Sequence, residues 1–210
     1  LDSSYEYDEE IESMFFKDNW FRPKYSMNSR ESLYFDLQED TLDIMPNKSK
    51  GWERQLRRAK KRNTKIIFGK GEFLEDEIKS VSKKMQQIKH IYLRDDPNKV
   101  IKIMNFFKNS IIFIYAVDNN GKMIGFRSCL FMNNYAWDFY ASSNNIGRKM
   151  EVGYLLLYEL VKECKKRGIK KFILPLSKNN IGDVEFKKRT GGEYYQYIGE
   201  WEYTNFKIMR

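Results

Sequence analysis

The fold of this chain is decided by the sequence Tyr-Ala-Trp-Asp-Phe-Tyr-Ala at 135–141 and by the long segment 150–167 that follows it. The first stretch is rich in aromatic residues, which favour strands. In the second stretch apolar residues recur along one helix face, and Gly168 ends the pattern as a C-terminal cap. Together they predict a strand that leads, through the loop 144–149, into a long helix packed on a sheet.

Further elements extend this unit on both sides. We expect strands at 110–117, 122–132, 171–174 and 193–203, and helices at 72–88, 98–108 and 184–189. The first two of these strands are joined by Asn119-Asn120-Gly121, which is typical of a tight hairpin turn. Three consecutive strands, followed by helix, strand, helix and strand, predict a mixed α/β (α+β) fold built on one sheet with flanking helices.

The first third of the chain has a different composition. It begins with a predicted helix at 5–17 and a predicted strand at 32–37, and a further strand is expected at 64–68. Between these strands, 48–62 holds eight basic residues and one acid. Trp52, Leu56 and Ala59 form a narrow apolar stripe at helical spacing, so we expect a helix whose remaining surface is basic. This helix carries most of the net charge of +9 and predicts contact with a polyanion.

Composition excludes several classes of protein. The 33 aromatic residues and the 41% apolar content exclude a disordered chain. The longest apolar run has seven residues, whereas a membrane span needs about 18, so no membrane span is expected. Cys129 and Cys164 are too few for a disulfide framework, and both lie in apolar patterns. We therefore expect buried free thiols and a cytoplasmic location.

The single histidine, His90, limits the possible chemistry. No G-x-S-x-G nucleophile motif is present, so a Ser-His-Asp or Cys-His device is not predicted. One histidine and two distant cysteines also predict no metal site. His90 follows the end of a predicted helix, where a structural role is favoured. An enzyme with this composition would work by positioning its substrates, with Lys, Tyr or Asp assisting.

Several segments resemble a known family of acyltransferases. The element order is similar to the GNAT acyltransferase fold, and the segments 51–63, 135–142, 154–168 and 184–193 resemble FemAB/FemX-type peptidyltransferases. The resemblance covers roughly 32–203 and mainly concerns the C-terminal GNAT-like domain of those proteins. It implies that 1–45 corresponds to the end of a preceding GNAT-like domain, 46–63 to a basic connecting helix, and 64–210 to the acyltransferase domain.

The resemblance also implies where the site lies. It places Phe186 and Lys187 near the reacting groups, where the Lys187 ammonium could stabilise an oxyanion. Asp138 and Tyr140 are two residues apart on one predicted strand, so we expect them on the same face, able to handle protons. These three polar residues are the candidate catalytic residues, and Phe186 is a candidate substrate contact.

Substrate binding is further assigned to two basic segments. On the basic helix, Arg54, Arg57, Arg58 and Lys61 are expected to meet phosphates. The loop 144–149, with Arg148 and Lys149, stands where CoA-dependent GNAT enzymes carry [Gln/Arg]-x-x-Gly-x-[Gly/Ala], whose backbone N–H groups bind pyrophosphate. Read from Arg148, the glycine position is Glu151, and a carboxylate there repels pyrophosphate. Read from Asn144, only Gly147 matches, so no cofactor is expected.

The resemblance implies an acyltransferase that moves an aminoacyl group from aminoacyl-tRNA to an amine or peptide acceptor, such as a peptidoglycan precursor of the cell wall. Two alternatives stay open. One is a CoA-dependent N-acetyltransferase, for which acetyl-CoA would be the cofactor. The other is a non-catalytic RNA-binding module that keeps the basic helix. The sequence makes no prediction of oligomeric state.

Overall fold

The structure is a computed structural model that describes residues 2–24, 29–38, 43–69, 74–89, 96–177 and 180–203. His90 lies outside the described residues. The main sheet has eight strands in the order β1-β9-β3-β8-β7-β6-β5-β4. Their bounds are β1 Asp2–Glu6, β3 Glu31–Asp36, β4 Lys65–Phe68, β5 Ile111–Val117, β6 Met123–Met132, β7 Tyr135–Ser143, β8 Lys171–Pro175 and β9 Glu193–Glu200. A separate pair joins β2 (Trp20–Phe21) to β10 (Glu202–Tyr203).

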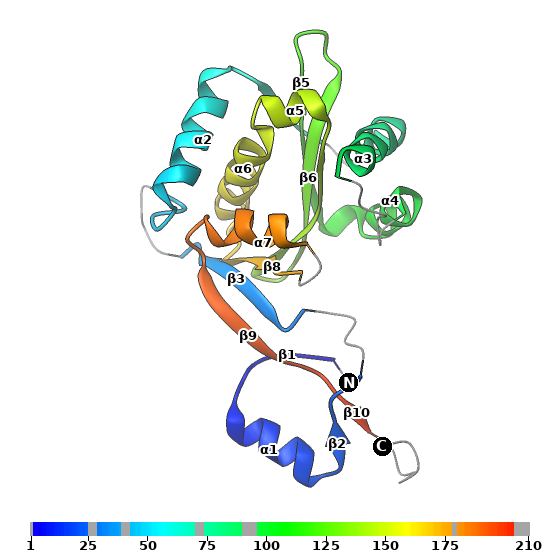
Figure 1. Ribbon diagram of the computed structural model, residues 1–210, viewed down its shortest axis with the longest axis vertical. Coiled ribbons are helices and arrows are strands. Elements are labelled where there is room, and N and C mark those ends of the chain that lie inside the picture. Colours follow the sequence, from blue (N-terminus) through cyan, green and yellow to red (C-terminus); the bar gives the residue numbers. More distant parts are fainter. Residues whose placement is uncertain are drawn as a thin grey trace.

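Helices cover both faces of this sheet (Figure 1). Their bounds are α1 Glu9–Lys17, α2 Lys50–Lys61, α3 Glu75–Lys89, α4 Pro97–Phe106, α5 Asn145–Lys149, α6 Val152–Lys166 and α7 Ile181–Lys188, with a 3-10 turn at Lys108–Ser110. Helices α6 and α2 contribute to one buried apolar cluster, and α3 and α4 to a second cluster on the opposite face. The mixed α/β sheet with flanking helices is therefore confirmed.

Most predicted elements are present within a few residues of their expected bounds, and three differences affect the architecture. Residues 2–6 form β1 against β9, so α1 begins only at Glu9, where the Asp8 carboxylate accepts hydrogen bonds from the Glu10 and Ile11 amides. The last predicted strand is divided into β9 and β10. The predicted loop 144–149 contains the short helix α5, because the Asn144 side chain accepts a hydrogen bond from the Gly147 amide at 3.0 Å.

Gly147 shows why this corner is compact. A Cβ atom at position 147 would lie 2.2 Å from the carbonyl oxygen of Ile124 on β6, a distance that no side chain tolerates. Glycine therefore allows α5 to approach the sheet closely. The next helix, α6, starts from a fixed position above the centre of the sheet, and it makes the crossover that a parallel pairing of β7 with β8 requires.

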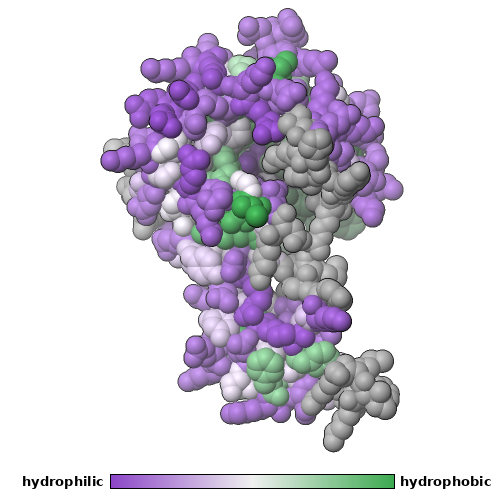
Figure 2. Space-filling model, in the orientation of Figure 1, coloured by the Kyte–Doolittle hydropathy of each residue, from purple (hydrophilic) through white to green (hydrophobic). Residues whose placement is uncertain are grey.

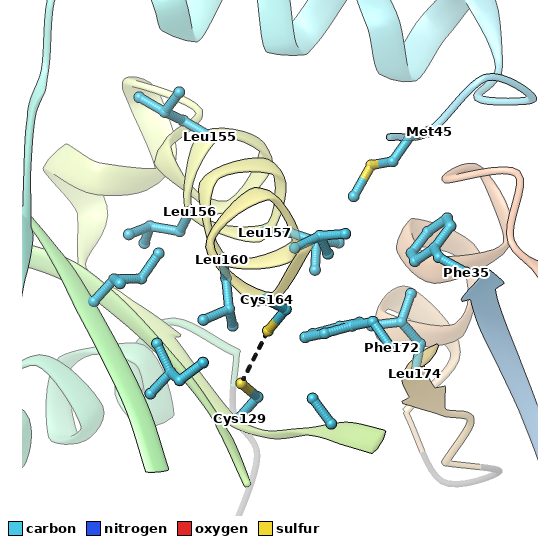
Figure 3. Packing of buried hydrophobic residues seen from close by; sticks show 14 of the residues in the cluster. Phe35, Met45, Cys129, Leu155, Leu156, Leu157, Leu160, Cys164, Phe172 and Leu174 are labelled. Atoms are coloured by element: carbon cyan, nitrogen blue, oxygen red, sulfur yellow. Dashed lines mark hydrogen bonds between the residues drawn. The ribbon is translucent and has the colours of Figure 1, made fainter. Parts of the chain in front are cut away.

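The two cysteines face each other across the core (Figure 3). Cys129 lies on β6 and Cys164 on α6, with their sulfur atoms 3.6 Å apart and both side chains fully buried. Burial and then the neighbouring thiol raise the pKa of Cys129 well above its ordinary value. Both are free cysteines, which confirms the prediction of buried thiols.

Leu160 provides a direct test of the α6 packing. It is fully buried and lies near Leu156 on the face of α6 that meets the sheet (Figure 3). Leu160→Ala should lower the free energy of unfolding by about 2–5 kcal/mol in urea denaturation, because a cavity would remain in the core. Lys162→Ala, at a side chain 64% exposed on the same helix, should change stability little. A loss below about 1 kcal/mol for the leucine variant would contradict this packing.

The strands β1 and β9 extend beyond the main body and carry α1, β2 and β10 (Figure 1). Trp201, between β9 and β10, is buried there: its ring stacks on Phe15 at 4.7 Å, and the Arg22 guanidinium lies 3.7 Å from the ring centroid. Along the part of the chain that the structure describes, every helix is too short or too polar to cross a lipid bilayer.

Candidate functional site

The candidate site lies where two neighbouring strands of the sheet separate. β7 pairs with β8 only through Tyr135, Ala136 and Trp137, whereas β7 continues to Ser143 and β8 ends at Pro175. A cleft of about 400 Å³ occupies the region beyond this divergence. Its lining comes from β6, β7, α3, α5, α6 and α7 and includes Arg127, Arg148, Glu151, Tyr154, Asp183 and Phe186.

A buried network of charges lies at one wall of this cleft. Arg127 on β6 donates two hydrogen bonds to the Asp138 carboxylate on β7, at 2.7 Å from Nε and 2.8 Å from Nη2. The Lys187 ammonium on α7 lies 3.4 Å from Asp138 Oδ2, the oxygen that also accepts from Arg127 Nη2, and 2.8 Å from Asp183. Arg127, Asp138 and Lys187 have side chains less than a tenth exposed. Two cations and two carboxylates therefore compensate each other at the divergence of the strands.

Lys187 is held by three acceptors. Besides the two carboxylates, its ammonium donates a hydrogen bond to the Pro175 carbonyl at the end of β8, at 2.8 Å. An ammonium has three N–H donors, so each has an acceptor within 3.4 Å. Among the described residues, the cleft lining includes the adjacent Phe186 and Asp183 but not Lys187 itself. The lysine therefore lies directly behind the cleft wall, and Asp183, whose side chain is 29% exposed, separates it from the cleft.

Asp138 is an ionised carboxylate in this network. Burial is the largest single influence on it and by itself would raise its pKa. The attraction of Arg127, followed by that of Lys187, outweighs burial, so the pKa of Asp138 is lowered from its ordinary value. Such a carboxylate is a weak proton acceptor. Its geometry suits a residue that positions Arg127 and Lys187.

The expectation that Asp138 and Tyr140 share one face is wrong. A β-bulge lies between their pairs: Cys129 opposes Asp138, but the next residue back, Ser128, opposes Tyr140, and Phe139 is the extra residue. Tyr140 is consequently buried in the cluster under α3 and α4, with its ring 5.6 Å from that of Phe126. Asp138 contacts the charged residues on the opposite side. The structure does not bring these two candidate catalytic residues together.

Phe186 joins the cleft to the basic helix. Its ring lies 5.0 Å from Tyr154 on α6 and 6.4 Å from Trp52 on α2, measured between ring centroids. The Arg127 guanidinium carbon lies 5.7 Å from the same ring, within cation–π range. Tyr154 and Phe186 line the cleft, and Trp52 on α2 packs against both of them.

The basic helix α2 is packed on α6 through Trp52, Leu56 and Ala59, all buried, which confirms the predicted stripe. The four candidate phosphate contacts, Arg54, Arg57, Arg58 and Lys61, are all exposed. Figure 2 shows a hydrophilic surface over α2 and a hydrophobic patch over α7, where the exposed Ile181 lies. Arg148 and Lys149 are exposed on α5, and Arg148 lines the cleft.

Glu151 lies at the corner between α5 and α6. Its backbone is left-handed, with φ 60° and ψ 28°, and its carboxylate forms ion pairs with Arg58 at 3.6 Å and Arg62 at 3.2 Å. Arg62 also donates a hydrogen bond to the backbone carbonyl of Lys149. The residue that stands where a pyrophosphate-binding loop would have glycine is therefore tied to the basic helix.

Comparisons with known proteins agree on the fold. No protein-family model and no curated protein matches the chain. FemX has a TM-score of 0.83 at 12% identity, over 99% of this chain and 72% of its own. L-PGS from Bacillus licheniformis has a TM-score of 0.64 at 15% identity, over 98% of this chain and 68% of its own. A GNAT-family acetyltransferase from Staphylococcus aureus Mu50 has a TM-score of 0.51 at 18% identity, over 64% of this chain and 99% of its own. The chain has the GNAT fold.

The GNAT fold confirms the expected resemblance to FemX at the level of structure. The acetyltransferase matches 64% of this chain and almost all of itself, so this chain is longer than a minimal GNAT unit. The strand β3, from the segment 1–45, is part of the same main sheet. It is hydrogen-bonded to β8 on one side and to β9 on the other.

Several residues of this site were not predicted from the sequence, among them Arg127, Asp183, Arg62 and Arg189. Arg127 had a detectable signal, since it is the only charged residue in the apolar strand β6 and the next strand carries the single acid Asp138. The partnership of Arg62 with Glu151 spans distant segments and left no local signal. Within the described ranges, no group of three or more metal-ligating side chains comes together.

Proposed function

We propose that this protein is an acyltransferase that moves an aminoacyl group from aminoacyl-tRNA to an amine acceptor such as a peptidoglycan precursor peptide. The observation that carries the proposal is the buried Lys187 at the point where β7 and β8 separate, with Phe186 beside it in the cleft wall. Ligands commonly bind where neighbouring strands of an α/β sheet diverge. The structural similarity to FemX supports the aminoacyl group over other acyl groups.

In the proposed reaction, the amine nitrogen of the acceptor attacks the ester carbonyl carbon of the donor. A C–N bond forms, and the carbonyl oxygen becomes a tetrahedral oxyanion. The C–O bond to the ribose then breaks, and the leaving oxygen takes up the proton that the amine releases. No covalent enzyme intermediate forms. Lys187 stabilises the oxyanion if the oxygen takes the place of Asp183, the most exposed of its three acceptors.

A direct transfer assay tests the proposal. Aminoacyl-tRNA with a labelled amino acid is incubated with the protein and a wall-precursor peptide that offers a free amine. We expect the label to move to the peptide in an amide bond and to require the free amine. Transfer of an acetyl group from acetyl-CoA, with no aminoacyl transfer, would contradict the proposal in favour of the acetyltransferase alternative.

Acetyl-CoA itself should bind weakly. The carboxylate of Glu151, only 15% exposed, stands at the corner where a pyrophosphate would have to approach the start of α6. Because like charges repel there, we expect a Kd for acetyl-CoA no tighter than roughly millimolar, about −4 kcal/mol. Calorimetric titration measures this constant. A low-micromolar Kd would overturn this view of the donor.

The exposed basic residues of α2 should bind phosphates. If Arg54, Arg57, Arg58 and Lys61 contact tRNA, changing all four to Gln should reduce the salt dependence of binding by about 0.7–0.9 in slope for each phosphate that the variant no longer neutralises. A matched control changes the exposed Lys83, Lys84, Lys99 and Lys102, on the helices of the opposite face, to Gln. Binding measured by fluorescence anisotropy at several salt concentrations gives both slopes. Equal slopes for the two variants would show that α2 has no special role.

A further inference from the structure

We propose that Glu151 is an internal anion that fills an anion-binding position made by Arg58 and Arg62, and that a phosphate-bearing ligand of α2 must displace it. We call this contact the Glu151 latch. The proposal rests on the proposed function in one respect, namely that α2 meets phosphates. It does not depend on which acyl group is transferred. It adds that phosphate binding at this contact changes the charge at the rim of the cleft.

The backbone at Glu151 is the first observation. Four non-glycine residues among those described have a positive φ: Asn19, Asn63, Asn133 and Glu151. Asparagine tolerates the left-handed region because its short side chain bonds to the local backbone, whereas glutamate gains no such compensation. At Glu151 the side chain makes no capping hydrogen bond to α6. Instead, its carboxylate is paired with Arg58 on α2 and with Arg62, the residue that follows α2, so the left-handed backbone occurs together with these two ion pairs.

The unequal exposure of the partners is the second observation. The Glu151 side chain is 15% exposed, whereas the side chains of Arg58 and Arg62 are 58% and 38% exposed. The carboxylate is covered and the two guanidinium groups are open to solvent. A phosphate can therefore reach the arginines from outside while they still contact Glu151. It offers more negative charge and more acceptor oxygens than a carboxylate, and guanidinium groups bind it in a bidentate manner.

Displacement of Glu151 by a phosphate would affect the cleft, because Glu151 is part of the cleft lining. Glu151 lines the cleft together with Arg148, Gly153 and Tyr154. Arg62 additionally holds the Lys149 carbonyl, so the latch connects α2 to the whole α5–α6 corner. When a phosphate takes over the two arginines, the carboxylate loses both cations and the cleft rim becomes more negative. Phosphate binding to the basic helix thereby changes the charge at the cleft. The released Glu151 carboxylate could then pair with the ammonium group of an incoming substrate.

The experiment compares Glu151→Gln with Glu53→Gln by calorimetric titration with inorganic pyrophosphate. Both variants remove one negative charge, and Glu53 pairs with Arg57 on the same helix, at 3.8 Å and with both side chains exposed. The latch predicts that Glu151→Gln tightens pyrophosphate binding about tenfold, because two ion pairs no longer compete. Glu53→Gln should tighten it by about twofold at most. Equal gains in both variants, or no gain at position 151, would overturn the latch.

Two further variants make the result specific. Arg58→Gln combined with Arg62→Gln should abolish the gain from Glu151→Gln, and a gain that persists would overturn the proposal. Glu151→Gly should show the same gain as Gln and a higher melting temperature, because glycine has no strain at a positive φ. It keeps the test valid if the Gln variant is unstable. Since no acyl transfer is measured, failure of the latch and failure of the proposed function are separate results.

Discussion

Asp138→Asn is expected to lower the free energy of unfolding by about 3–5 kcal/mol at pH 7. The substitution leaves the Arg127 guanidinium without its two charge-assisted hydrogen bonds and removes one carboxylate from Lys187. Both cations remain buried with Asp183 as the one remaining carboxylate, and an uncompensated buried charge is costly. Urea denaturation of the variant and of the native protein gives the difference.

Asp183→Asn is the matched control for this prediction. It makes the same chemical change on another partner of Lys187, but its side chain is 29% exposed, so we expect a loss of no more than about 1 kcal/mol. The pH dependence adds a second check. Because the folded-state pKa of Asp138 is lowered, its contribution is complete above an unfolded pKa of about 4 and is lost as the pH falls through the folded pKa. The difference between native protein and Asp138→Asn should therefore shrink at low pH.

Lys187→Met should reduce kcat for aminoacyl transfer by roughly 10²–10³-fold, the cost typical of losing one oxyanion donor. The side chain keeps its length and loses its charge. Since the oxyanion exists only in the transition state, KM should change little and kcat/KM should fall in parallel with kcat. Steady-state kinetics with the labelled donor measures both constants. Asp138 keeps Arg127 in this variant, so we expect it to remain folded.

Lys188→Met controls for the charge change, because Lys188 is the next residue on α7 and is exposed. It should retain full turnover. Thermal melting of both variants fixes an assay temperature at which each is folded, so that a loss of stability is not mistaken for a loss of catalysis. Native turnover in Lys187→Met would show that the lysine only supports the charge network, and the proposed oxyanion role would be wrong.

Regular elements with strong local patterns were predictable from the sequence. The apolar stripe and Gly168 define α6, and the run at 111–117 defines β5, because a buried face imposes its period on the sequence. The position of Phe186 and Lys187 on a short helix was also predictable, but the burial of Lys187 was not. That burial depends on the Pro175 carbonyl and on Asp138, which come from two other elements.

Features that depend on pairing between strands or on distant partners were not predictable. The bulge at Phe139 changes the face of Tyr140, and a local alternation rule cannot detect one extra residue. Similarly, the carboxylate of Glu151 was evident as a group that opposes pyrophosphate, yet its arginine partners lie on and just after a helix far earlier in the chain. The sequence supplies the charges, and only the packing of α2 on α6 determines which of them meet.

The place of β3 has a consequence for how the molecule folds. This strand is inserted between β8 and β9, whose residues follow it by more than a hundred positions, so its hydrogen bonds close very long loops. Such non-local pairings raise the contact order and slow folding. The β5–β6–β7 meander can form early from neighbouring residues. During synthesis, β3 must wait until β8 and β9 have left the ribosome, and its open edges need protection from aggregation in that interval.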